Sequence, residues 1–99
     1  MHKAAVVIPN YNGIQYLETC LDALRQQTWR DFYTILVDNG SSDGSLELVK
    51  TRYPEVEIVS LPENLGFCRA VNEGIRKAEA EYVILLNNDT QAEERFVEE

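Results

Sequence analysis

The sequence predicts an α/β fold in which helices flank a parallel β-sheet with the strand order 3-2-1-4. Two observations carry this prediction. Short apolar runs rich in β-branched residues alternate along the chain with segments whose apolar residues recur at helical spacing. In addition, a polar loop follows each apolar run, directly or after a short turn, as at the edge where open α/β sheets bind ligands.

Four apolar runs are expected to form the strands: residues 4–8, 32–37, 56–61 and 82–86. The first run, AAVVI, is continuously apolar, as in a strand that is buried on both faces. Pro9 ends it. This arrangement corresponds to one mononucleotide-binding half of a doubly wound, Rossmann-like sheet.

Three helices are expected between the strands. The first is indicated by apolar residues at helical spacing: Ile14, Leu17, Leu21 and Leu24. The second covers residues 45–52, where Asp43 can cap the start and Pro54 follows as a stop. The third covers about residues 67–80 and is expected to bury three apolar residues: Val71, Ile75 and Ala78. A further helical pattern begins at residue 91 and runs to the last residue.

Length and composition limit the classes of protein. We expect the 99 residues to form a single domain, truncated at its carboxyl end because the helical pattern runs to the last residue. Nine basic against 17 acidic residues give a formal net charge of -8, which argues against nucleic acid as a partner. No apolar run reaches the length of a membrane span, and we expect no signal peptide, since the first apolar run covers only residues 4–8.

Several chemistries lack the residues that they need. Cys20 and Cys68 give neither a disulfide framework nor a metal-ligand spacing, and we interpret both as reduced, structural thiols in a cytoplasmic protein. The only histidine is His2, so no histidine-based nucleophile triad is available. The phosphate loop of P-loop NTPases and the Gly-x-Gly-x-x-Gly of dehydrogenases are both missing after the first strand.

Four polar segments are expected to meet at the carboxyl edge of the sheet: residues 9–13, 37–45, 63–72 and 85–90. Asp38 stands at the end of the second strand, where a carboxylate can accept hydrogen bonds from a base edge or a ribose hydroxyl, so we favour a binding role for it. Turn chemistry is favoured for the residues that follow it: Asn39, Gly40, Ser41 and Ser42. For Asp43 a helix cap is favoured over a ligand contact.

Three other residues each allow two interpretations. Asp89 either supplies an oxygen ligand to Mg²⁺ beside a bound diphosphate or belongs to a turn that caps the last helix. Arg69 either contacts a phosphate or lies on the surface. Tyr11 either stacks on a base or packs within its loop.

Together, the four segments resemble the nucleotide-sugar-binding half of the family 2 glycosyltransferases, which have the GT-A fold. The resemblance rests on VIPNYN (residues 7–12), on VDNGSSDGS (residues 37–45) and on NLGF (residues 64–67) with Arg69, Asn72 and Gly74. It covers nearly the whole chain. It implies that residues 1–99 bind the donor of an inverting transfer of sugar from a nucleoside-diphosphate sugar to an acceptor hydroxyl.

The resemblance also implies which residues bind the donor: Pro9, Tyr11, Asp38, Arg69 and Asn88. Asp38 would bind the base, and Arg69 would lie near the nucleoside and the phosphates. Residues 87–89 take the place of the family's Asp-x-Asp metal motif, so Asp89 would hold Mg²⁺ or Mn²⁺. Asn87 replaces the first acid of that motif, which leaves the metal preference open.

The NNDT sequence at residues 87–90 is also expected of rhamnosyltransferase-like members, whose donor would be a deoxythymidine or uridine diphosphate sugar. The family's general base is an Asp in a later segment, so no catalytic residue is expected within this chain. The acceptor would be a glycan or a lipid-linked glycan of cell-wall or polysaccharide biosynthesis. The full-length enzyme would act in the cytoplasm, at the inner face of the membrane.

Two other classes remain as alternatives. A non-catalytic nucleotide-binding module would also lack a general base. A nucleotidyltransferase would need a Gly-rich basic loop after the first strand, which residues 10–13 (NYNG) do not provide. We further expect the chain to self-associate, because a fourth strand without an outer neighbour exposes an edge and apolar surface.

Overall fold

The computed structural model describes residues 2–27 and 31–86 of the chain. Within these residues strands and helices alternate, as predicted: β1 (His2–Asn10), α1 (Ile14–Arg25), β2 (Phe32–Asp38), α2 (Ser45–Arg52), β3 (Glu57–Ser60), α3 (Phe67–Lys77) and β4 (Ala80–Leu85). The helical pattern that begins at residue 91 lies outside the described residues.

The four strands are parallel and lie in the order β3-β2-β1-β4, which confirms the predicted sheet. β1 lies between β2 and β4, so that Val6 pairs with Thr34 on one side and with Ile84 on the other. β1 does not end at Pro9 as predicted, because Pro9 and Asn10 still pair with Val37 and Asp38 of β2. β4 begins at Ala80, earlier than predicted, because Ala80 already pairs with His2 at the start of β1.

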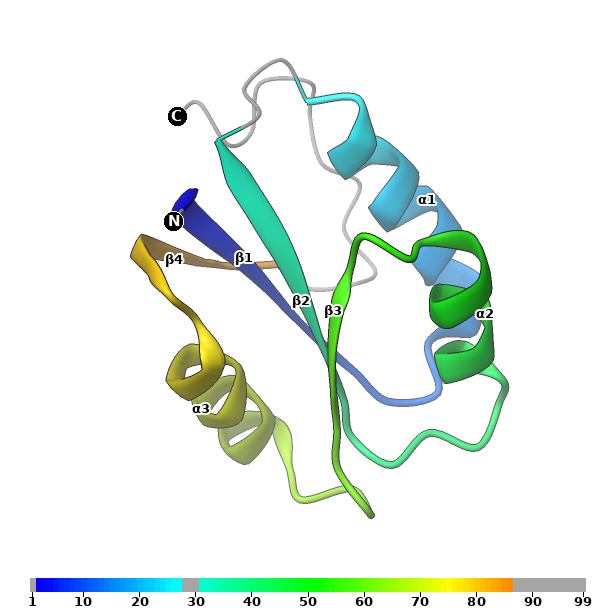
Figure 1. The fold of residues 1–99 in the computed structure, drawn as a ribbon. Coiled ribbons are helices and arrows are strands. Elements are labelled where there is room, and N and C mark those ends of the chain that lie inside the picture. The colour runs from blue at the N-terminus through cyan, green and yellow to red at the C-terminus, as the bar shows by residue number, and fades with distance from the viewer. Residues whose placement is uncertain (1, 28–30, 87–99) are drawn as a thin grey trace.

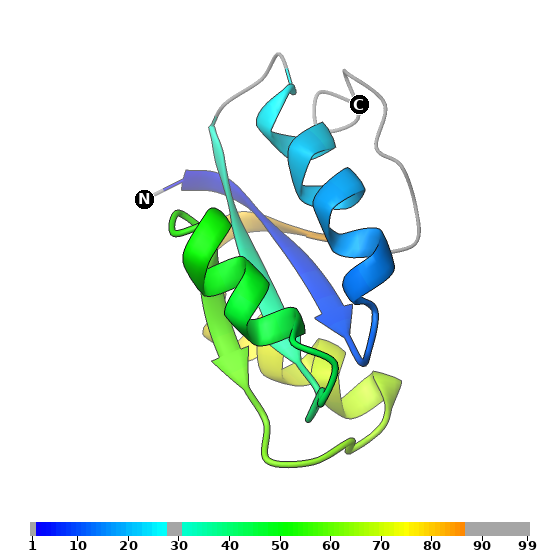
Figure 2. The ribbon, with the colours of Figure 1, turned by 90° about the vertical axis from the view of Figure 1, so that its right-hand side faces the viewer.

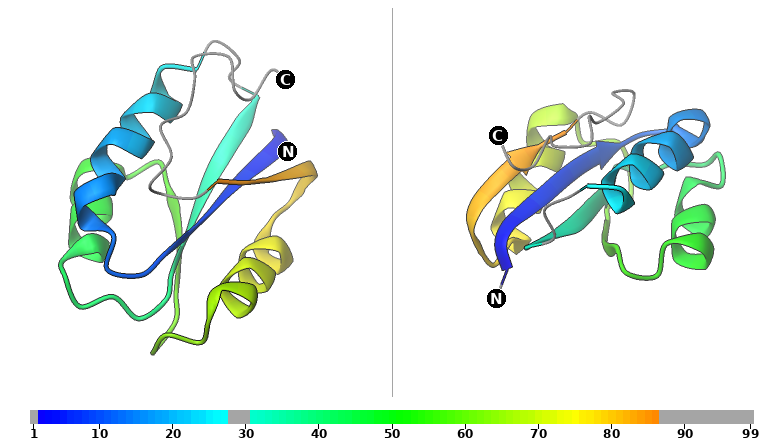
Figure 3. Two further views of the ribbon diagram at one scale, coloured as in Figure 1. Left: turned by 180° about the vertical axis from the view of Figure 1, so that it is seen from behind. Right: turned by 90° about the horizontal axis from the view of Figure 1, so that it is seen from above.

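Helices cover both faces of the sheet (Figure 1). α1 and α2 lie in front of the sheet in Figure 2 and α3 lies behind it, and both panels of Figure 3 show the same separation. The core on the α1 and α2 face includes Val6, Ile8, Leu17, Leu36 and Val49. The core on the α3 face consists of Ala5, Val7, Ile35, Val37 and Ala70. Because β1 sends alternate side chains into both cores, its apolar run is continuous.

Helix α3 approaches the sheet through small residues. Ala70 and Gly74 are its buried positions. A Cβ atom on Gly74 would collide with Cγ1 of Val7 and lie 3.0 Å from Cγ2 of Val37. The absence of a side chain at Gly74 therefore lets the helix backbone lie directly on the centre of the sheet.

This close approach corrects part of the predicted burial pattern. Ile75 is 47% exposed rather than buried, and Val71 and Ala78 are only half-buried. The contact through Gly74 sets the rotation of the helix and turns Ile75 outward. The helix also ends at Lys77 rather than near residue 80, because Ala78 has an extended backbone that leads into β4.

The two cysteines differ in their surroundings. Cys20 is buried in α1, as a structural thiol would be. Cys68 is exposed on α3, so its interpretation as a structural thiol is wrong. Both are free thiols, and Cys68 lies on the surface because α3 packs through the opposite positions, Ala70 and Gly74.

Strand β4 carries large apolar side chains that are exposed: Tyr82, Val83 and Leu85. Val83 and Leu85 pair with Ala5 and Val7 of β1 and therefore share the face of the sheet on which α3 lies. In the part of the chain that the structure describes, β4 pairs only with β1. None of the described helices is both long and apolar enough to cross a membrane.

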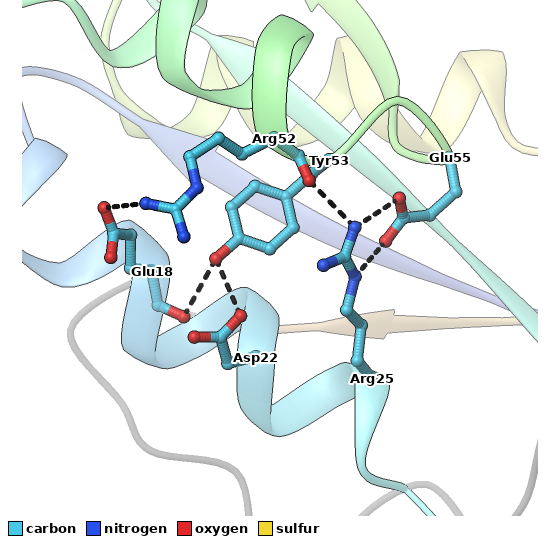
Figure 4. A network of polar contacts seen from close by, with 6 residues as sticks. All are labelled: Glu18, Asp22, Arg25, Arg52, Tyr53 and Glu55. Atoms are coloured by element: carbon cyan, nitrogen blue, oxygen red, sulfur yellow. Dashed lines mark hydrogen bonds and ion pairs between the residues drawn. The ribbon is translucent and has the colours of Figure 1, made fainter.

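A polar network joins α1 to the chain after α2, at the end of the sheet where the strands begin (Figure 4). Arg25 holds the Glu55 carboxylate through two hydrogen bonds of 2.6 and 2.8 Å and lies over the ring of Tyr53. The Tyr53 hydroxyl donates to Asp22 at 2.7 Å. Burial, together with this hydrogen bond, raises the pKa of Tyr53 to about 12. A cavity of about 380 Å³ between α1 and the start of β2 belongs to this same end.

Candidate functional site: the carboxyl edge of the sheet

The carboxyl ends of β1, β2 and β3 lie side by side. Asn10 pairs with Asp38, and Asp38 pairs with Ser60, and these are the last residues of the three strands. The loops that follow therefore start from one edge, as the sequence predicts, and this edge is at the bottom of the view in Figure 1. Side-chain hydrogen bonds then join the loops to one another.

Asp38 is held in place from two directions. It is only 2% exposed. One carboxylate oxygen accepts a hydrogen bond from Nδ2 of Asn10 at 3.1 Å, and the other accepts one from the main-chain amide of Ser41 at 3.1 Å. A carboxylate has about four lone-pair positions, so each oxygen keeps one for another donor. The carboxylate is therefore fixed before any ligand arrives.

Ser41 joins the first loop to the second. Its hydroxyl oxygen accepts hydrogen bonds from Nδ2 of Asn10 at 3.2 Å and from the main-chain amide of Asn12 at 2.9 Å. In return, the Asn12 side chain accepts a hydrogen bond from the main-chain amide of Ser42 at 2.8 Å. The turn that the sequence predicts here is thus also a contact between two loops.

Asp43 serves the starts of two helices. It accepts a hydrogen bond from the main-chain amide of Ile14, the first residue of α1, at 3.0 Å, and another from the amide of Ser45, the first residue of α2, at 3.0 Å. The Ser45 hydroxyl also donates to it. Burial acts to raise the pKa of the Asp43 carboxyl, but these hydrogen bonds outweigh it and hold that pKa below its usual value. Asp43 thus binds the first main-chain amide of α1 as well as that of α2, although Gly44 rather than Asp43 is the N-cap residue of α2.

Asn39 binds the third loop to the end of β2. It is buried, and its Nδ2 donates to the side-chain oxygen of Asn64 at 2.9 Å and to the carbonyl of Gly66 at 3.2 Å. Its own side-chain oxygen accepts a hydrogen bond from the main-chain amide of Leu65 at 2.9 Å. Next to it, Gly40 has a φ of +81° and touches the backbone of Glu63 so closely that a Cβ would lie 2.6 Å from it.

The other expected donor-binding residues are more open. Pro9 is half-buried near the end of β1, and Tyr11 is 51% exposed in the loop that follows. Arg69 lies in the first turn of α3 with a side chain that is 63% exposed and 4.0 Å from the carboxylate of Glu73. All three lie on elements that start or end at the carboxyl edge.

Asn88 and Asp89 lie outside the described residues. In the described ranges 2–27 and 31–86, no group of three or more His, Cys, Asp or Glu residues is placed to hold a metal ion.

Sequence reasoning missed the roles of Asn10 and Asn39. Asn10 orients Asp38, and Asn39 fixes the third loop. Each directly follows or ends a buried strand, and a polar side chain there was the available signal. Their partners lie more than 20 residues away in the sequence, so local spacing does not reveal them.

Comparison with known proteins identifies related sequences. Residues 5–99 match the family model described as Glycosyl transferase family 2. The teichoic acid poly(glycerol phosphate) polymerase of Staphylococcus epidermidis is 30% identical over 95 residues, which are 92% of this chain and 13% of that protein.

Solved structures show the same fold. TarS 1-349 of S. aureus in complex with UDP-GlcNAc has a TM-score of 0.90 and 25% identity, covering 97% of this chain and 29% of that one. A mannosyltransferase of Pyrobaculum calidifontis, PcManGT, in complex with GDP-Man and Mn2+ has a TM-score of 0.85 and 26% identity, covering 91% of this chain and 28% of that one. The chain thus spans less than a third of the length of each of these three proteins.

Proposed function

The chain belongs to glycosyltransferase family 2, and we propose that its carboxyl-edge site binds the nucleoside diphosphate of a sugar donor. The observation that carries this proposal is the buried carboxylate of Asp38, held by Asn10 and Ser41 at the end of β2. The solved complex of TarS with UDP-GlcNAc, a structural neighbour, supports a nucleotide sugar as the ligand.

Asp38 is suited to recognise a base. Its free lone pairs accept hydrogen bonds, and uracil and thymine both present a ring N–H donor between two carbonyl groups. Because the carboxylate is already fixed, binding does not have to order it. The exposed ring of Tyr11, which follows β1 at the same edge, offers a surface on which the base can stack, and the half-buried Pro9 would line the nucleotide site beside it.

Arg69 is suited to contact the diphosphate. Its guanidinium group is exposed, and it lies in the first turn of α3, where the helix dipole favours negative charge. Its ion pair with Glu73, at 4.0 Å, is long and easily exchanged for a phosphate.

The proposal includes a divalent cation at the diphosphate. Asp89 would hold Mg²⁺ or Mn²⁺, with Asn88 beside it, and the cation would offset charge on the leaving diphosphate. The Mn²⁺ in the mannosyltransferase complex supports this. We propose that residues 1–99 form neither the general base nor the acceptor site. We propose an inverting transfer to a glycan or lipid-linked glycan, with rhamnose as one candidate sugar, and the teichoic acid polymerase among the relatives favours a cell-wall product.

Calorimetric titration of the chain with UDP, deoxythymidine diphosphate and GDP tests the proposal. UDP or deoxythymidine diphosphate should bind, and Asp38→Ala should weaken that binding about 10-fold or more, since a hydrogen bond to a charged group is lost. Asp38→Asn, which keeps the shape of the side chain, should also weaken it.

Asp31→Ala is the matched control, because Asp31 is exposed and stands before β2 rather than after it. That variant should bind as the parent does. Unchanged affinity in a folded Asp38→Ala variant would remove Asp38 from the site. No binding of any nucleoside diphosphate by the parent would reject the proposed function.

A further inference from the structure

We propose that Asn39 is a positioning residue for the diphosphate: it fixes residues 61–66 and thereby the start of α3, from which Arg69 reaches the phosphates. This inference rests on the proposed function and adds to it a residue that makes no contact with the ligand. It is carried by the hydrogen bonds of Asn39 and by the close approach at Gly40.

The loop of residues 61–66 has little else to hold it. Residues 62–66 are all exposed, so no apolar core fixes them. The main-chain amide of Leu61 donates to the carbonyl of Asp38 at 2.8 Å, which fixes only the beginning of the loop. Beyond that point, the side chain of Asn39 provides three hydrogen bonds to Asn64, Leu65 and Gly66. Buried polar contacts of this kind specify one arrangement of a loop.

Asn39 also reaches the helix itself. Its Nδ2 donates to the carbonyl of Gly66, and the same carbonyl accepts the hydrogen bond from Ala70 that opens α3, at 3.1 Å. Arg69 is the neighbour of Ala70 in that first turn. Asn39 therefore fixes the backbone position of Arg69 through its hydrogen bond to Gly66.

Gly40 makes this arrangement specific. Its φ of +81° and its contact with Glu63 bring the third loop against the second, so that the short side chain of Asn39 spans the gap. The main-chain amide of Asn39 donates to the carbonyl of Asn10 at 2.8 Å, which anchors the residue to the end of β1. Asn39 thus holds the start of α3 in a fixed position relative to the sheet.

The test is a double-mutant cycle with UDP and uridine as the ligands, measured by calorimetry. Asn39→Ala should weaken UDP binding by roughly fivefold, because residues 61–66 are then not held in place before UDP binds and binding has to order them. The loss should be far smaller for uridine, which has no phosphate. In an Arg69→Ala background, Asn39→Ala should cause no further loss of UDP affinity, since its effect acts through Arg69.

Two further variants keep the test decisive. Asn64→Ala removes a partner of Asn39 at an exposed position and should repeat the effect even where Asn39→Ala folds poorly. Gln26→Ala is the matched control, because it removes an exposed side-chain amide after α1, away from this edge, and should leave UDP binding unchanged.

A loss of UDP affinity that is equal in both backgrounds, or equal for UDP and uridine, would overturn the inference, as would unchanged affinity in folded variants. Failure of the parent chain to bind UDP would overturn the proposed function, and the inference with it, before any variant is compared. The two failures are therefore distinguishable.

Discussion

Asp43 accepts a hydrogen bond from the main-chain amide of Ile14 at 3.0 Å, although 29 positions separate the two residues in the sequence. The same carboxylate accepts a hydrogen bond from the main-chain amide of Ser45. One side chain thus binds the first residues of two helices that lie on the same face of the sheet. The starts of α1 and α2 are thus fixed together at the edge where the nucleotide is proposed to bind.

Asp43→Asn should lower the free energy of unfolding by about 1 kcal/mol near pH 7, because an amide has one acceptor oxygen and cannot accept from both Ile14 and Ser45. The folded state holds the pKa of Asp43 below its value in the unfolded chain. Its stabilising effect is therefore present above the unfolded pKa, near 4, and is lost as the pH falls through the folded pKa.

Urea denaturation from pH 7 to pH 2.5 measures this difference. The difference in the free energy of unfolding between the parent and Asp43→Asn should become smaller below about pH 4. Glu81→Gln, at an exposed carboxylate of β4, should show almost no difference from the parent at any pH. A gap for Asp43→Asn that does not change with pH would mean that the ionised carboxylate is not what stabilises the two helix starts.

Gly74→Ala should lower the free energy of unfolding by about 1–3 kcal/mol, because the added methyl group collides with Val7 in a packed core. Val7→Ala makes room for that methyl group. The double variant should therefore lose less stability than the sum of the two single variants. Strict additivity in chemical denaturation would show that the loss caused by Gly74→Ala does not arise from contact with Val7.

Asp89→Ala should abolish the part of the diphosphate affinity that depends on added Mg²⁺ or Mn²⁺ and leave metal-free binding nearly intact. The reason is that Asp89 is the only carboxylate in residues 85–90, and hard cations require oxygen ligands. Calorimetry with and without metal, beside Asp31→Ala as the control, measures this. Metal-dependent binding that survives in Asp89→Ala would assign the cation to other acidic residues.

The isolated chain should self-associate through β4. Val83 and Leu85 are 40% and 46% exposed on the side of α3, and exposed apolar side chains on an open strand edge favour pairing with another chain. Light scattering should show a mass above the monomer's, and Val83→Lys should reduce it. A clean monomer at high concentration of the parent would contradict this expectation.

The strands and their order could be predicted because a strand buried on both faces has a distinctive apolar run, and alternating helices leave few topologies. The exposure of Ile75 could not be predicted, because the rotation of α3 is set by the contact between Gly74 and Val7 across the fold. The position of Asp38 followed from its place at the end of β2. The role of Asn39 did not, because turn chemistry explains an Asn-Gly pair equally well and its partners are distant in the sequence.

The place of β1 at the centre of the sheet has a consequence for synthesis. Its partner on one side, β2, follows after a single helix, but its partner on the other side, β4, begins only at Ala80, which pairs with His2. A ribosome therefore releases β1, α1, β2, α2 and β3 while one hydrogen-bonding edge of the central strand still has no neighbour. For that interval, the nascent chain exposes unpaired backbone N–H and C=O groups of β1 to any other strand in its surroundings. Slow translation between residues 60 and 80 therefore prolongs the period in which mispairing competes with folding.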